Sequence, residues 1–189
     1  MQLANVLVLF YSRSGFTRIV AAALAQALGA DLAELKDTTN RAGLLGYLRS
    51  GLDAALGRLT RLEPLSKDPT AYSLVVVGTP VWNASVSSPV RTFLVQHGAA
   101  LRNVAFFCTF GARGANRALA QMAEACGTQP LATMAIRDRE LESPFARTRI
   151  GEFVKRLEAA ATARGPVGAA PTAPPPAPAR RETSRLAGP

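Results

Sequence analysis

The chain has 189 residues, 22 basic and 13 acidic side chains, and a formal net charge of +9. This length suits one domain with a substantial core. The apolar runs are far shorter than the ~20 residues that a membrane-spanning helix needs, and two cysteines are too few for a disulfide framework or a metal cluster.

The N-terminus lacks the basic segment and cleavage pattern of a signal peptide, so residues 1–10 predict a core strand and the chain is expected to be cytoplasmic. The basic side chains are scattered, and no DNA-binding motif accompanies them. We therefore expect no nucleic-acid partner. Acidic partners or anionic ligands suit the charge better.

A strand, a turn and a helix open the chain. Residues 6–10 are bulky and apolar, as in a strand buried on both faces, and apolar residues at helical spacing run from Phe16 to Leu28. The turn between them holds three hydroxyls, one glycine and one arginine: Ser12, Ser14, Thr17, Gly15 and Arg13. N–H groups, hydroxyls and charge at a helix N-terminus predict a phosphate site. Ordinary helix capping explains the same residues, and the spacing fits neither standard nucleotide fingerprint.

Strands and helices alternate along the rest of the chain. Further strands are predicted at residues 31–36, 73–78, 104–108 and 131–136, and further helices at 41–59, 89–97, 115–126 and from about 143 past 157. Residues 79–88 are predicted to be a loop. Cys108 and Cys126 fall on apolar positions, so we expect both to be buried and inert. His97, the single histidine, ends a helix, and nothing indicates that it is catalytic.

The helix predicted at residues 41–59 is basic and amphipathic. Leucines recur at helical spacing, with Arg41, Arg49 and Arg58 among them. Such a helix either lies on a membrane surface or packs against a sheet. Packing against a sheet is commoner and is what an α/β fold needs here, so membrane contact is the lesser alternative.

These elements predict an α/β fold, a three-layer α/β/α sandwich with a five-stranded, doubly wound parallel sheet. Ligands bind at the carboxyl ends of the strands in such folds. The polar, glycine-bearing loops after the first, third and fourth strands meet at one ligand only in the strand order 2-1-3-4-5, which we therefore expect. Composition changes near residue 164, so we predict a folded domain at 1–163 and a disordered, basic Pro/Ala-rich tail at 164–189.

Over about residues 3–160 the chain resembles the flavodoxin family. Residues 12–17 are similar to its phosphate loop, [ST]-x-[ST]-G-x-T, although Phe16 stands where asparagine is frequent. Residues 78–83 resemble the second flavin loop of flavodoxin-like oxidoreductases, and residues 109–114 take the place of the third. The resemblance implies an FMN site formed by Ser12, Arg13, Ser14, Gly15, Phe16, Thr17, Thr79, Pro80, Val81, Trp82, Asn83, Thr109, Phe110, Gly111, Arg113 and Gly114.

Departures from the family pattern bear on function. Electron-carrier flavodoxins are usually strongly acidic and often have a tyrosine in the third loop, whereas this chain is basic and has Phe110 and Arg113 there. A cation near the flavin would stabilise its reduced anion. The resemblance therefore implies a cytoplasmic FMN-dependent oxidoreductase that passes electrons from NAD(P)H to a quinone or other small acceptor. FMN carries the chemistry, so no catalytic side chain and no metal is assigned.

Two other functions stay open, along with one structural question. A flavodoxin-type carrier would serve electron transport to a redox partner protein, and a cofactor-free, flavodoxin-like module would serve as an interaction domain. Trp82 either covers one flavin face or anchors its loop in the core. A homo-oligomer is compatible with each function.

Overall fold

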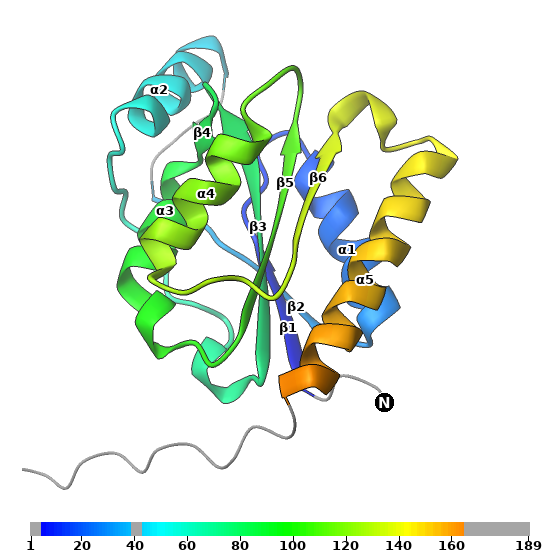
Figure 1. The fold of residues 1–189 in the computed structure, drawn as a ribbon. Helices are drawn as coiled ribbons and strands as arrows, with labels where there is room; N and C mark the ends of the chain where they lie inside the picture. Colours follow the sequence, from blue (N-terminus) through cyan, green and yellow to red (C-terminus); the bar gives the residue numbers. More distant parts are fainter. Residues whose placement is uncertain (1–4, 39–42, 165–189) are drawn as a thin grey trace, which may run out of the picture.

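A parallel sheet forms the middle layer of the computed structural model, which describes residues 5–38 and 43–164 (Figure 1). Its strands are β1 (Val6–Phe10), β2 (Asp31–Glu34), β3 (Leu74–Trp82), β5 (Val104–Phe110) and β6 (Thr133–Arg137). They are arranged in the order β2-β1-β3-β5-β6, and all of these pairs are parallel. Numbered along the chain, the five parallel strands have the order 2-1-3-4-5, which confirms the prediction.

Helices cover both faces of the sheet. In Figure 1, α1 (Phe16–Leu28) and α5 (Pro144–Arg164) lie on one side of the sheet, and α3 (Ser88–His97) and α4 (Ala115–Cys126) lie on the other. Three short 3-10 turns, the helix α2 (Gly43–Ala55) and the two-residue strand β4 (Ser85–Val86) complete the described elements. The three-layer α/β/α sandwich is therefore as predicted.

Side-chain alternation explains why β1 is apolar throughout. Val6, Val8 and Phe10 pack with residues of α1 and α5, whereas Leu7 and Leu9 pack with residues of α3 and α4. A strand that is buried on both faces cannot alternate apolar with polar residues. The two cores on either side of the sheet hold the carboxyl ends of β1, β3 and β5 at one edge, at the top of Figure 1.

The connection after the third predicted strand corrects the sequence prediction, which made residues 79–88 a loop. Strand β3 runs on to Trp82, the chain reverses at Asn83 and Ala84, and the short strand β4 (Ser85–Val86) pairs antiparallel with β3. The φ angles of Asn83 and Ala84 are +46° and +56°, as in the two-residue hairpin turns that match strand twist. An alanine in this conformation is uncommon, and no sequence signal marked the hairpin.

Helix α2 also differs from the prediction, because the two leucines whose side chains the structure describes, Leu48 and Leu52, are not buried against the sheet. Among the described side chains of α2, the buried ones are small or polar, namely Gly46, Ser50, Asp53 and Ala54. By contrast, Leu48, Leu52, Leu56 and Leu59 have between 54% and 58% of their surface exposed. Helix α2 lies near the hairpin, above α3 in Figure 1, and not flat on the sheet. Arg41 lies outside the described residues.

The last described helix, α5, ends at Arg164, and the predicted boundary at residue 163 stays a prediction. Residues 165–189, which make up the rest of the predicted tail, lie outside the described residues. Both cysteines are buried and unpaired, as predicted. In the part that the structure describes, no helix is long and apolar enough to cross a bilayer.

Candidate functional site

A cavity of about 500 Å³ opens at the carboxyl ends of β1, β3 and β5. Its lining comes from the three predicted loops, from α2 and from the turn after β6: Arg13, Ser14, Phe16, Leu48, Gly51, Leu52, Pro80, Val81, Trp82, Asn83, Thr109, Gly111 and Asp138. The volume lies within the range of about 300–1,000 Å³ that is typical of small-molecule sites. The loops therefore converge on one space, as the strand order requires.

The first loop divides its residues between shaping the turn and facing the cavity. The Ser12 hydroxyl accepts the N–H groups of Gly15 at 3.1 Å and Arg18 at 3.4 Å, and Gly15 has a φ of +95°. Ser12 and Gly15 thus form the turn, as the capping interpretation describes. Arg13 and Ser14 line the cavity beside the N-terminus of α1, which favours anions.

A pair of buried hydroxyls connects the first and third loops. Thr17 is buried, and its Oγ1 lies 2.9 Å from Oγ1 of Thr109. Thr109 lines the cavity and Thr17 does not. This hydrogen bond fixes the distance between the start of α1 and the end of β5. Thr17 therefore positions the loop in the structure.

Trp82 anchors its loop in the core and also lines the cavity; whether it covers a flavin face stays a prediction. The indole is 8% exposed and packs edge-on against Tyr11, with the ring centroids 5.5 Å apart. It therefore anchors the end of β3 in the core. Trp82 also lines the cavity, together with its neighbours Pro80, Val81 and Asn83.

Thr79 supports the second loop through its hydrogen bonds and does not contact the cavity. Its side chain is buried, and its Oγ1 lies 3.0 Å from the Ser87 hydroxyl and accepts the Ser87 N–H at 3.2 Å. These contacts connect β3 to the segment just after β4, so they hold the hairpin closed. Thr79 is not part of the cavity lining.

The third loop contacts the hairpin directly at Gly114. A Cβ atom on Gly114 would lie 2.3 Å from Cα of Ala84, and Gly114 has a φ of +96°. Only a glycine allows this close approach of two loops. Gly111 lines the cavity, whereas Gly114 does not.

Phe110 and Arg113 lie outside the lining of the cavity. Phe110 is half-buried, and the guanidinium carbon of Arg137 lies 5.6 Å from the centre of its ring. Arg113 is exposed. The expected approach of Arg113 to a bound flavin stays a prediction.

Asp138 faces the cavity from the turn after β6, which no predicted loop included. Its Oδ1 is buried and has no hydrogen-bond partner among the described residues. Burial raises the pKa of this carboxyl above its usual value. An unsatisfied acceptor in a cavity is suited to a ligand hydroxyl. The available signal was its place directly after a strand at the ligand-binding edge of the sheet.

Leu48, Gly51 and Leu52 are the other lining residues that sequence reasoning missed. They were assigned to a helix that was expected to pack against the sheet. Because α2 instead lies beside the hairpin, with a Cβ on Gly51 expected 3.9 Å from Cβ of Asn83, it closes one side of the cavity. Together with Phe16 and Trp82 these residues make that wall largely apolar.

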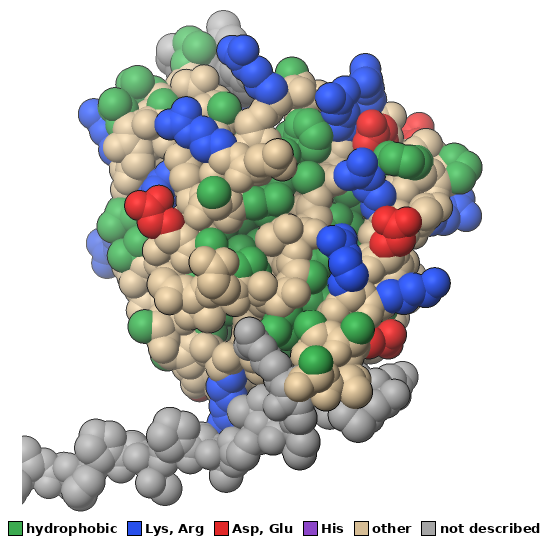
Figure 2. Space-filling view, viewed as in Figure 1, with side chains coloured by type: hydrophobic (Ala, Val, Ile, Leu, Met, Phe, Trp, Pro, Cys, Tyr) green, Lys and Arg blue, Asp and Glu red, His purple; other side chains and the backbone are tan. Residues whose placement is uncertain are grey.

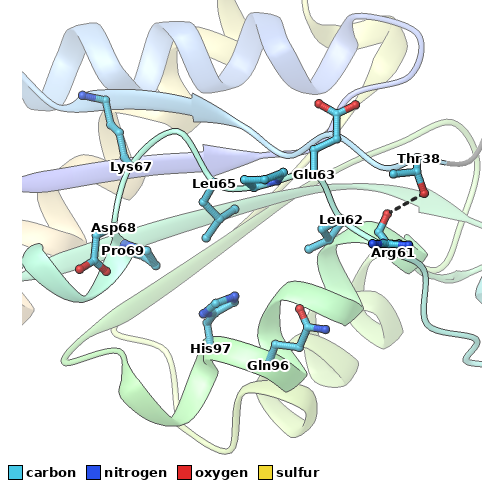
Figure 3. A pocket seen from close by; sticks show the side chains of 11 residues that line it. Thr38, Arg61, Leu62, Glu63, Leu65, Lys67, Asp68, Pro69, Gln96 and His97 are labelled. Carbon is cyan, nitrogen blue, oxygen red and sulfur yellow. Dashed lines mark hydrogen bonds between the residues drawn. The ribbon is translucent and has the colours of Figure 1, made fainter.

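A second hollow, of about 730 Å³, lies away from the three loops (Figure 3). It is lined by Thr38, by residues 61–65 and 67–69, and by Gln96 and His97 at the end of α3. His97 stacks on Phe93, with ring centroids 5.2 Å apart. Acidic and basic side chains alternate along the hollow's rim, so it does not select one charge. In the described parts of the chain, no group of three His, Cys, Asp or Glu side chains is placed to hold a metal ion.

Residues 5–155 match the family model described as Flavodoxin. The chain belongs to the flavodoxin family. No curated protein matches it. Among solved structures, a flavoprotein from Lactobacillus acidophilus in complex with FMN is 25% identical, with a TM-score of 0.62; the match covers 73% of this chain and 96% of that protein.

Two more distant structures share the flavodoxin fold. Oxidised flavodoxin 2 from Bacillus cereus is 16% identical over 82% of this chain and 99% of its own, with a TM-score of 0.56. A WrbA-like flavodoxin protein from Agrobacterium tumefaciens is 16% identical over 82% of this chain and 96% of its own, with a TM-score of 0.53. The cavity of the present flavodoxin-family chain thus occupies the edge of the sheet where this fold class binds ligands.

Proposed function

We propose that the chain binds FMN in the cavity at the sheet edge and acts as an NAD(P)H-dependent oxidoreductase. The acceptor is a quinone or another small molecule. The observation that carries the proposal is the convergence of the three loops on one cavity of about 500 Å³. The family match and the FMN complex of the Lactobacillus acidophilus flavoprotein support the choice of cofactor.

The residues present fit the parts of FMN. Arg13 and Ser14, beside the N-terminus of α1, provide charge and a hydroxyl for a phosphate. The unpaired Oδ1 of Asp138 provides an acceptor for a sugar-alcohol hydroxyl. Trp82, Val81 and Leu52 provide apolar surface for a planar ring.

When bound, FMN supplies the relay for two electrons between donor and acceptor. NAD(P)H gives up a hydride, and a quinone takes two electrons and two protons, the second proton coming from solvent. The role of the chain itself is to bind FMN, to orient it and to shield it from water. The hydrogen bond between Thr17 and Thr109 and the contact of Gly114 with Ala84 hold the three loops in place.

The first experiment compares FMN with riboflavin, which lacks the phosphate. We expect the purified protein to show a flavin spectrum, and the apoprotein to bind FMN at least tenfold more tightly than riboflavin in a fluorescence titration. Arg13→Ala should reduce this preference, because it removes the cation at the phosphate end, whereas Arg147→Ala on α5 should not. A protein that binds neither flavin would contradict the proposal and favour an interaction module.

The second experiment tests the reaction. NADH or NADPH added without oxygen should bleach the flavin absorption, and a quinone should restore it. If neither nicotinamide reduces the flavin, the oxidoreductase proposal is wrong while FMN binding stands. Potentiometry then tests the carrier function, which predicts two well-separated one-electron steps with a very low second potential.

A further inference from the structure

Four exposed leucines lie in α2 and in the turn that follows it. Leu48, Leu52 and Leu56 are one helical turn apart, because the Leu56 N–H still bonds to the Leu52 carbonyl at 2.9 Å, and Leu59 follows the turn. Each is more than half exposed. Residues that lie four apart share one side of a helix, so this side of α2 is exposed. We call these four residues the leucine stripe.

The stripe begins at the mouth of the cavity. Leu48 and Leu52 line the cavity together with Phe16, which is also exposed. Leu56 and Leu59 continue the stripe and do not line the cavity. An apolar surface therefore runs from the candidate FMN site outward along α2. Contiguous exposed apolar surface of this kind marks interaction sites.

The charge beside the stripe is positive. Arg58 and Arg61, which follow α2 in the chain, are exposed. Asp53, the single acid of α2, is buried and lies 3.5 Å from Arg58. Figure 2 shows hydrophobic side chains interspersed with Lys and Arg side chains at upper left, where Figure 1 places α2.

The area of the stripe favours a membrane surface over a second copy of the chain. Four half-exposed leucines offer on the order of a few hundred Å² of apolar surface, well below the ~800 Å² per partner of a stable protein interface. A second copy would also bring a second net charge of +9 to the contact. A helix with exposed leucines on one side, followed by exposed arginines, suits an anionic lipid surface.

We propose that the leucine stripe docks the protein on anionic membranes, with the mouth of the cavity at the lipid surface. Docking itself does not require the proposed reaction, whereas the route of the acceptor rests on the proposed function. In that position, an acceptor that enters past Leu48 and Leu52 would come from the lipid phase. The docking is peripheral and reversible, since one short helix supplies the apolar contact.

Vesicle sedimentation tests the proposal. The full-length protein should sediment with vesicles of phosphatidylcholine and phosphatidylglycerol, and at least tenfold more weakly with phosphatidylcholine alone. The double variant L56E/L59E should lose binding to anionic vesicles at least tenfold. V95E replaces a similarly exposed apolar residue on α3 and should retain it. Leu56 and Leu59 do not line the cavity, so the double variant should still bind flavin, which shows that it is folded.

Three results would overturn the proposal. The first is that the wild-type protein fails to sediment with anionic vesicles. The second is that L56E/L59E sediments with them as well as the wild type does. The third is a wild-type dimer in analytical ultracentrifugation that L56E/L59E converts to a monomer, because the stripe would then be the interface between two copies.

Discussion

Close contacts between single residues hold the candidate site together. Gly114 touches the hairpin turn at Ala84, Thr17 touches Thr109, and Trp82 packs on Tyr11. Each contact joins two segments that are remote in sequence. The shape of the cavity therefore depends on residues such as Thr17 and Gly114 that do not line it.

Gly114→Ala should destabilise the protein by about 2–4 kcal/mol, because it adds a clash with Ala84 to the cost of a positive φ. Gly127→Ala is the matched control: its φ is +69° and no atom lies within 4 Å of the added Cβ, so it should cost only about 1 kcal/mol. Urea unfolding of both variants measures the difference. Equal losses would show that the contact with Ala84 is not constraining.

Cys108 should be unreactive in the folded protein. It is buried in β5, and burial raises the pKa of its thiol to about 12. Ellman's reagent at pH 8 should label neither Cys108 nor the buried Cys126 until guanidinium is added. Fast labelling of a thiol without denaturant would contradict the burial.

The same pKa shift gives a dependence of stability on pH. The folded state favours the protonated Cys108 thiol, so its contribution is fully present below the unfolded pKa of about 9 and is lost as the pH rises toward about 12. Cys108→Ala should therefore show a smaller loss of stability between pH 9 and 11 than the wild type.

At the scale of elements, the open edge of β6 is covered by α5. The Arg149 guanidinium donates to the Ala135 carbonyl at 2.8 Å, and Arg156 donates to the Thr133 carbonyl at 3.2 Å. Both carbonyls belong to an edge strand, which would otherwise present them to another chain. The two arginines thus fix the helix to the strand and block strand addition there.

Arg149→Met should cost about 1 kcal/mol of stability, because it keeps the unbranched apolar stem of the side chain and removes the hydrogen bond to Ala135. Arg147→Met, at an exposed position of the same helix, should stay within about 0.5 kcal/mol of the wild type. Urea unfolding measures both. If Arg147→Met is as costly, helix charge and not the edge contact explains the loss.

For the molecule as a whole, the described fold ends with α5, and the cavity residues lie between Arg13 and Asp138. We predict that a chain ending at Arg164 binds FMN with unchanged affinity and unfolds at the same temperature, because the predicted tail adds nothing to the core. Calorimetry and flavin titration of the truncated and full chains make the comparison. A loss of affinity would assign the tail a role at the site.

Much of this architecture could be predicted from the sequence. Continuous apolar runs such as residues 6–10 indicated doubly covered strands, and glycines such as Gly29 and Gly127 marked the helix ends. Loops after parallel strands lie at one edge by geometry, so residues from three loops could be assigned to one site. These signals are local or follow from chain topology.

The rest depended on tertiary packing. Periodicity shows that a helix is amphipathic, but it does not show what covers its apolar side, so the exposure of Leu48 and Leu52 could not be foreseen. Asp138 lines the cavity because β6 lies beside β5. Thr17 does not line it, and its hydroxyl instead forms a hydrogen bond with Thr109. The sequence by itself determined the sheet and the edge where ligands bind. The tertiary structure decided which side chains face that ligand and which face the outside, because both depend on contacts between segments far apart in the chain.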